Sequence, residues 1–269
     1  MVTLERVGYN LRRVRQTVNT FANWQDAFRT MARKGPELSL TLRDGRRISL
    51  PNVPGARVPV YEIFAEDAYR LGWFTADLPA DFGALDIGGH IGCFSVALAT
   101  EQPEARIWAF EASPSTAAYT RRNVEQNGLD GRILVENVAI SSEAGFLTFA
   151  DNAGASGLNG ITAPEGTETI QVPAVTFADA VAAADRPIRL VKIDTEGAEY
   201  DIVLGSNPDD WAGVDRVVLE FHDVPGHGWD ELADFFATAG LSVVHREDAT
   251  DRLGTVWLSR GPLDPPAAA

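Results

Sequence analysis

From Gly83 onward, short apolar segments alternate with segments of helical character. The apolar segments that fit strands are 84–87, 107–111, 133–135, 188–194 and 217–221, followed by a closing pair at 241–244 and 255–258. Parallel strands need long crossover connections, which helices normally supply. The pattern therefore predicts an α/β three-layer sandwich, with a mostly parallel sheet covered by helices on both faces.

The first 80 residues lack this alternation and are expected to form a cap. Apolar residues at three- and four-residue steps over 11–28 predict an amphipathic helix that ends near Gly35. Residues 38–50 predict a β-hairpin, and 61–73 a second short helix. We expect this cap to pack on the main domain and to close over its substrate.

Three boundaries follow from this division of the chain. The cap is assigned to residues 1–80, the main domain to 81–260, and a disordered tail to 261–269. Within the main domain, the Gly- and Asn-rich segment 150–168 interrupts the strand pattern. Long loops in compact domains are usually functional, so this segment is either a lid or a plain surface loop.

The composition excludes several classes of function. Of the 269 residues, 23 are Lys or Arg and 38 are Asp or Glu, which gives a net charge of −15 and disfavours nucleic acid and anionic membranes as partners. The single cysteine, Cys93, excludes an internal disulfide and a multi-cysteine zinc site. Neither a membrane-spanning run nor a signal peptide is evident, so a cytoplasmic enzyme acting on a small molecule is expected.

The turn after the first strand is rich in glycine. Ligands of such sheets bind beyond the carboxyl ends of the strands, and Gly88, Gly89, His90 and Gly92 lie there. Their spacing differs from the Gly-x-Gly-x-x-Gly of a nicotinamide site. Asp86 precedes the turn, where we expect its carboxylate to repel a phosphate and to suit a cationic ligand such as S-adenosylmethionine.

The next two strand ends suit an adenosyl group. Glu111 ends the second strand, and an acid at this place can accept hydrogen bonds from both ribose hydroxyls. Ala112 and Ser113 follow it and are included in the predicted cofactor site. Asn137 and Ala139 follow the third strand and are expected to border the adenine ring, although Asn137 also fits a simple turn residue.

Acidic residues and a histidine follow the fourth and fifth strands. Asp194, Glu220 and His222 are the predicted catalytic residues, and Asp194 is also placed beside the cofactor. His222 suits a general base, oriented by Glu220 or Asp194. Alternatively, the three residues hold a divalent cation such as Mg²⁺, or positioning alone suffices. Thr195, Glu196 and Glu199 also fit residues that cap the following helix.

Taken together, these motifs resemble the FkbM family of S-adenosylmethionine-dependent methyltransferases. The resemblance is carried by 86–92, Glu111, 191–199 and 219–222, and it covers roughly residues 80–225. His90 departs from the Asn that is usual in the family, and 177–179 reads Phe-Ala-Asp where Leu-Asp-Asp is commoner. The resemblance implies a class I methyltransferase fold, Rossmann-like, with seven strands of which the last is antiparallel.

The resemblance also implies O-methylation of a small hydroxylated metabolite, of sugar or polyketide type. Three alternatives stay open: N-methylation on the same scaffold, a non-catalytic protein that binds an adenosyl ligand within an assembly, and a nicotinamide dehydrogenase, which Asp86 disfavours. The N-terminal helix could mediate a homodimer.

Overall fold

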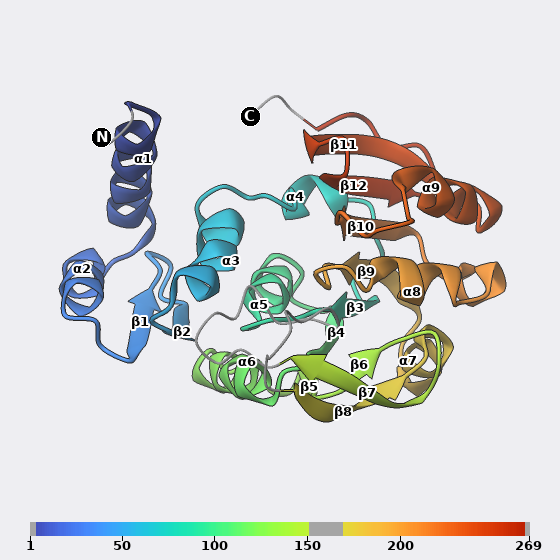
Figure 1. Ribbon diagram of the computed structural model, residues 1–269, viewed down its shortest axis with the longest axis horizontal. Coiled ribbons are helices and arrows are strands. Elements are labelled where there is room, and N and C mark those ends of the chain that lie inside the picture. Colours follow the sequence, from blue (N-terminus) through green and yellow to red (C-terminus); the bar gives the residue numbers. More distant parts are fainter. Residues whose placement is uncertain (1–3, 151–168, 267–269) are drawn as a thin grey trace.

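Seven strands form the main sheet within residues 4–150 and 169–266, which the computed structural model describes (Figure 1). They are β3 (Gly83–Ile87), β4 (Arg106–Phe110), β5 (Ile133–Glu136), β9 (Ile188–Ile193), β10 (Arg216–Phe221), β11 (Ser242–Thr250) and β12 (Leu253–Ser259). Their order is β11-β12-β10-β9-β3-β4-β5. Of the strand pairs in this sheet, only those made by β12 are antiparallel. The predicted class I methyltransferase sheet, with its antiparallel last strand, is therefore confirmed.

The central strands are buried on both faces because helices cover the sheet from each side. The helices are α5 (Cys93–Glu101), α6 (Pro114–Gln126), α7 (Phe177–Ala183), α8 (Glu199–Leu204) and α9 (Trp229–Thr238), and a 3₁₀ turn, η2, spans Pro208–Trp211. Successive strand residues point to opposite faces. Ala84 thus joins the core that contains α5, whereas Leu85 joins the core that contains α7, α8 and α9.

A second, small sheet follows β5 and was not predicted. It comprises β6 (Ala139–Ile140), β7 (Gly145–Ala150) and β8 (Thr169–Val175), in the order β6-β8-β7. In Figure 1 it lies beside α7, at the β5 edge of the main sheet. The segment interpreted as a lid or loop, 150–168, falls between β7 and β8 and, apart from Ala150 itself, lies outside the described residues.

The cap contains the predicted elements with two corrections. Its elements are α1 (Leu4–Thr20), α2 (Trp24–Ala32), β1 (Glu37–Thr41), β2 (Arg47–Pro51), α3 (Pro54–Phe64) and α4 (Leu71–Phe74). The long first helix is broken near Phe21, which is fully buried and forms a bridge to Leu42. The second helix, predicted over 61–73, instead spans 54–64, and α4 forms a separate short helix; Pro54 is well suited to the first turn of α3.

The cap shares its hydrophobic core with the main domain. Leu40 and Ile48 of the β1–β2 hairpin belong to the same buried cluster as Phe94 and Val96 of α5. Asn123 of α6 ties the two together, since its amide donates to the carbonyl oxygens of Ser49 (3.0 Å) and Ile91 (2.8 Å). The cap is therefore held firmly beside the carboxyl ends of the strands.

The described part of the tail makes contacts, although 261–269 was expected to be disordered. The indole Nε1 of Trp73 donates to the carbonyl oxygen of Asp264 at 2.6 Å, and Leu263 packs against the core that the cap shares. None of the helices in the described residues is both long and apolar enough to cross a membrane.

Candidate active site

A cavity of about 330 Å³ opens at the carboxyl ends of β3, β4, β9 and β10. This volume lies within the range of ~300–1,000 Å³ that is usual for small-molecule sites. Four segments outside the main sheet also line the cavity: α3 of the cap, the loop after β5, β6 and β7. The cavity thus lies where ligands of doubly wound sheets bind.

The glycine-rich turn forms the floor of this cavity. Gly88 and His90 line it, whereas Gly89 and Gly92 lie in the same turn and shape its backbone. Gly88 has φ +78°, and a Cβ there would lie 1.8 Å from the carbonyl oxygen of Asp194. Only glycine permits the ends of β3 and β9 to approach so closely.

Asp86 does not face the cavity, contrary to the prediction. It is fully buried; Ser95 Oγ donates to its Oδ2 at 2.6 Å, and Lys192 Nζ lies 3.2 Å from its Oδ1 as an ion pair. Lys192 also donates to the carbonyl oxygen of Gly88 at 2.6 Å. Burial alone would lower the pKa of Lys192, but the carboxylates of Asp86 and Asp194 raise it, so the lysine stays charged. Asp86 therefore supports the turn from behind.

Glu111 lines the cavity and holds the turns after β3 and β4 together. Its Oε2 accepts from the His90 amide at 2.7 Å and its Oε1 from the Ser113 amide at 2.8 Å. Burial raises the pKa of Glu111 to about 7, and these amide hydrogen bonds act against that rise. Each oxygen retains a lone pair, so the carboxylate can still accept a hydrogen bond from a hydroxyl group.

The other residues predicted for the cofactor divide into two groups. Ala112 and Ala139 line the cavity. Ser113 instead caps α6 by accepting from the Thr116 amide, and Asn137 donates to the carbonyl oxygens of Glu111 and Ala112. Ser113 and Asn137 are therefore structural supports rather than part of the described wall.

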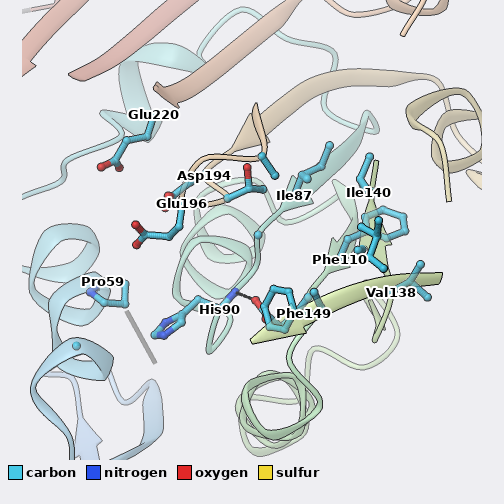
Figure 2. A pocket seen from close by; sticks show the side chains of 18 of the residues that line it. Pro59, Ile87, His90, Phe110, Val138, Ile140, Phe149, Asp194, Glu196 and Glu220 are labelled. Atoms are coloured by element: carbon cyan, nitrogen blue, oxygen red, sulfur yellow. Dashed lines mark hydrogen bonds between the residues drawn. The ribbon is translucent and has the colours of Figure 1, made fainter. Parts of the chain in front are cut away.

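The cavity has two chemically different ends (Figure 2). One is apolar, and its side chains come from β4, β6, β7 and the loop after β5: Phe110, Val138, Ile140, Leu147 and Phe149. The other is acidic, with Glu62, Asp194, Glu196 and Glu220. Lys and Arg are missing from the wall that the described residues form. An aromatic ring suits the first end, and a cation suits the second.

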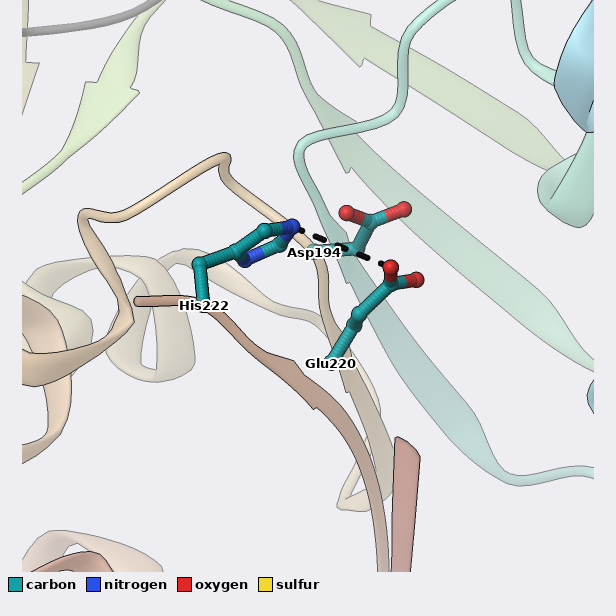
Figure 3. A group of neighbouring side chains, drawn as sticks. All are labelled: Asp194, Glu220 and His222. Carbon is teal, nitrogen blue, oxygen red and sulfur yellow. Dashed lines mark ion pairs between the residues drawn. The ribbon is translucent and has the colours of Figure 1, made fainter. Parts of the chain in front are cut away.

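The structure brings the three predicted catalytic residues together (Figure 3). One ligand atom from each of Asp194, Glu220 and His222 lies within 4.8 Å of the others, and Glu220 Oε1 is 3.7 Å from His222 Nε2. Burial and the nearby Asp194 raise the pKa of Glu220. Asp194 and Glu220 line the cavity, whereas His222 is not part of its wall.

His222 is oriented by Glu199, not by Glu220 or Asp194 as predicted. Glu199 is fully buried; its Oε1 accepts from the His222 amide at 2.6 Å and lies 3.2 Å from the ring Nδ1. Burial opposes charge on the ring, but Glu199, Asp194 and Glu220 outweigh it and raise the pKa of His222 to about 9. Since the imidazole is then already protonated near neutral pH, it is a poor general base.

Glu196 and His90 are held in left-handed backbone conformations, with φ +54° and +48°. Both line the cavity, and such strain in non-glycine residues gathers at functional sites. Glu196 Oε2 lies 3.5 Å from His222 Nε2. Glu196 therefore belongs to the acidic end of the cavity and does more than shape the turn before α8.

Several residues of the site had no recognisable sequence signal. Glu62 lines the cavity from α3, and burial together with Asp194 raises its pKa to about 7. The hydroxyl of buried Tyr69 donates to Asp194 Oδ2 at 3.1 Å. Phe149 comes from the unpredicted sheet. Each reaches the cavity through packing between distant parts of the chain, and no local motif records that.

Comparison with known proteins gives a consistent result. Residues 86–246 match the profile of the Methyltransferase FkbM domain. The chain is 30% identical over 241 residues to the 31-O-demethyl-FK506 methyltransferase FkbM of Streptomyces tacrolimicus, which covers 78% of this chain and 91% of that protein. It is 27% identical over 186 residues to Methyltransferase 1 of Beauveria bassiana, covering 61% and 73%.

Among solved structures, the chain is similar to Methyltransferase FkbM from Methylobacillus flagellatus. That similarity has 14% identity and a TM-score of 0.49, and it covers 70% of this chain and 46% of the solved one. A second structure, M. jannaschii TYW2 in complex with AdoMet, has 13% identity and a TM-score of 0.47, and the similarity covers 83% of this chain and 85% of the solved one.

Proposed function

Because the chain belongs to the FkbM family of methyltransferases, we propose that it transfers the methyl group of S-adenosylmethionine to a hydroxyl of a small metabolite. One observation carries the proposal: a single cavity joins an apolar end beside Glu111 to an acidic end beside Asp194 and Glu220. The relative from Streptomyces tacrolimicus is named for O-methylation, which favours oxygen over nitrogen as the acceptor.

The apolar end suits the adenosine of the cofactor. Phe110, Ile140 and Phe149 offer surfaces on which an adenine ring can pack, and Glu111 has lone pairs for the ribose hydroxyls. The methionine part would then extend over Gly88 toward Asp194. Its sulfonium would reach the acidic end, where the carboxylates favour positive charge.

The reaction requires in-line displacement at the methyl carbon. The acceptor oxygen forms a bond to that carbon while the carbon–sulfur bond breaks, and the electron pair leaves with sulfur as a neutral thioether. Holding the reacting atoms ~3–3.5 Å apart supplies much of the rate enhancement. The hydroxyl proton must go to a base, and we assign this role to Glu220, which lines the cavity. Its pKa of about 8 lies closer to neutral pH than that of His222, about 9, so a larger fraction of Glu220 is in the form that accepts a proton.

A divalent cation on Asp194, Glu220 and His222 is the second way to activate the hydroxyl. Such a metal would have to displace the proton that the surrounding carboxylates hold on His222, and Lys192 Nζ already lies 3.7 Å from Asp194 Oδ2. We therefore favour a side-chain base. Full activity after exhaustive chelation is expected, and activity that needs added Mg²⁺ would contradict this assignment.

Calorimetry with S-adenosylhomocysteine tests the cofactor assignment. Glu111→Gln places an amide NH₂ against one of two backbone N–H donors, so we expect at least tenfold weaker binding. Glu136→Gln, at an exposed residue that ends β5, is the matched control and should bind normally. Unchanged binding by Glu111→Gln, or tighter binding of NAD than of S-adenosylhomocysteine, would overturn the proposal.

A further inference from the structure

The cap supplies one wall of the acidic end, and that wall carries a carboxylate, Glu62, that has no partner in the described part of the chain. Gly55, Val58, Pro59 and Glu62 line the cavity at three- and four-residue steps, so they lie on one face of α3. Among residues 4–150 and 169–266, no hydrogen bond or ion pair is formed by the Glu62 carboxylate. Arg13 lies nearby, but it pairs with Glu66 at 2.9 Å.

The neighbouring carboxylates have partners of their own. Tyr69 and Lys192 contact Asp194, and His222 contacts both Glu196 and Glu220. The cofactor carries a sulfonium, an ammonium and a carboxylate, so its net charge is a single positive one. After cofactor binding, Glu62 would still lack a partner among the described residues, and it lies on the side of the cap.

An independent feature of the same cavity, in the glycine-rich turn, points to a polar ligand. Both ring nitrogens of His90 are buried, and neither has a hydrogen-bond partner among the described residues. The imidazole lines the cavity near Pro59 of α3 (Figure 2). A neutral imidazole offers one donor and one acceptor, which suits a hydroxyl group. Leaving both nitrogens unpaired is costly, so a ligand that pairs with them gains affinity.

We infer that the acceptor is an amino alcohol or amino sugar, whose protonated amine is held by Glu62 while His90 hydrogen-bonds one of its hydroxyls. This inference rests on the proposed methyl transfer and names its substrate class. The amine would lie on the cap side, and the hydroxyl to be methylated would face Glu220 on the side of the sheet. Anionic acceptors would be repelled by the same four carboxylates.

Matched probes test the inference on the protein loaded with S-adenosylhomocysteine. D-glucosamine and D-glucose differ by one ammonium in place of one hydroxyl, and their binding is compared by calorimetry or ligand-observed NMR at fixed ionic strength. We expect the amine to bind at least tenfold more tightly, and Glu62→Gln to remove that preference. Asp26→Asn, an exposed carboxylate of α2 in the same cap that pairs with Arg29 outside the cavity wall, is the control for non-specific attraction and should keep the preference.

His90→Asn tests the second contact, because Asn tolerates the left-handed conformation of this residue. We expect weaker binding of both sugars with the amine preference retained. Equal responses to the two sugars, including none to either, would overturn the inference, as would a preference that survives Glu62→Gln. If the unmodified protein does not bind S-adenosylhomocysteine at all, the proposed function is overturned, and the inference with it.

Discussion

The ring Nδ1 of His222 lies 3.2 Å from Oε1 of Glu199, a carboxylate that is completely buried. The other oxygen of Glu199 accepts from the Gly197 amide at 2.9 Å. One buried side chain therefore fixes both the turn after β9 and the imidazole after β10. The contact joins the two strand ends that carry Asp194 and Glu220, so it sets the geometry of the acidic end.

We expect Glu199→Gln to lower the pKa of His222 from about 9 toward its ordinary range, because the strongest source of positive-charge stabilisation is removed. Turnover should fall through loss of positioning, and the free energy of unfolding by about 1–3 kcal/mol. NMR titration of the imidazole and denaturant unfolding measure these effects. Glu231→Gln, which breaks an exposed contact of 3.1 Å to His227, is the control and should cost less than about 1 kcal/mol. An unchanged His222 titration would show that Glu199 is not the source of the shift.

Stability should fall as the pH rises from 5 to 9. The pKa values of Glu62, Glu111 and Glu220 are raised, so their contributions are present below their unfolded values and are lost as the pH passes through about 7 to 8. His222 adds in the same direction, since its raised pKa favours folding below about 6.5 and loses that effect by about 9. Thermal unfolding across this range measures the trend.

Glu220→Gln provides the check on that trend. It removes one raised carboxyl and should flatten the fall in melting temperature above pH 7. A melting temperature that rises from pH 5 to 9 in the unmodified protein would contradict the charge distribution described for the cavity.

Gly88→Ala should abolish binding of S-adenosylhomocysteine. A Cβ at this residue would lie 1.8 Å from the carbonyl oxygen of Asp194, so the ends of β3 and β9 must separate. Gly128→Ala is a close control, because Gly128 also has a positive φ, +66°, but nothing lies within 4 Å of its added Cβ. The control should lose only about 1–2 kcal/mol of stability and keep normal binding. Normal binding by Gly88→Ala would mean that the turn adopts another conformation.

Asp86 and Lys192 should behave as a coupled pair. Removing one partner leaves a buried charge uncompensated, so Asp86→Asn or Lys192→Met alone is expected to cost about 3–5 kcal/mol. The double variant should lose less than the sum of the two single losses. Denaturant unfolding of the four proteins completes the cycle, and strictly additive losses would rule out the coupling.

The sequence was most informative where a local pattern determines the structure. Alternating apolar segments located β3, β4, β9 and β10, and residues directly after these strands line the cavity. The β1–β2 hairpin was also evident, because its apolar residues alternate. These features depend on neighbours in the chain, and a short window of sequence records them.

The sequence was least informative where distant segments meet. Asp86 was assigned to a cationic ligand because it directly precedes the glycine-rich turn, whereas its ion pair with Lys192 depends on the register between β3 and β9. From sequence, Glu199 fits a helix-capping residue; its contact with His222 exists only because β10 lies beside β9 in the folded sheet. Glu62 lies in a different part of the chain from the strand ends and reaches the cavity only through packing of α3 on α5.

Because α3 and the glycine-rich turn line different parts of the cavity, the acceptor specificity of this protein can change separately from its cofactor binding. Glu111 and the apolar residues that suit adenosine come from the strands and the loops after them. Part of the wall assigned to the acceptor comes from α3, which precedes these strands in the sequence. Substitution of three or four side chains along one face of that helix would change which acceptors bind, while the binding site for the methyl donor stays the same.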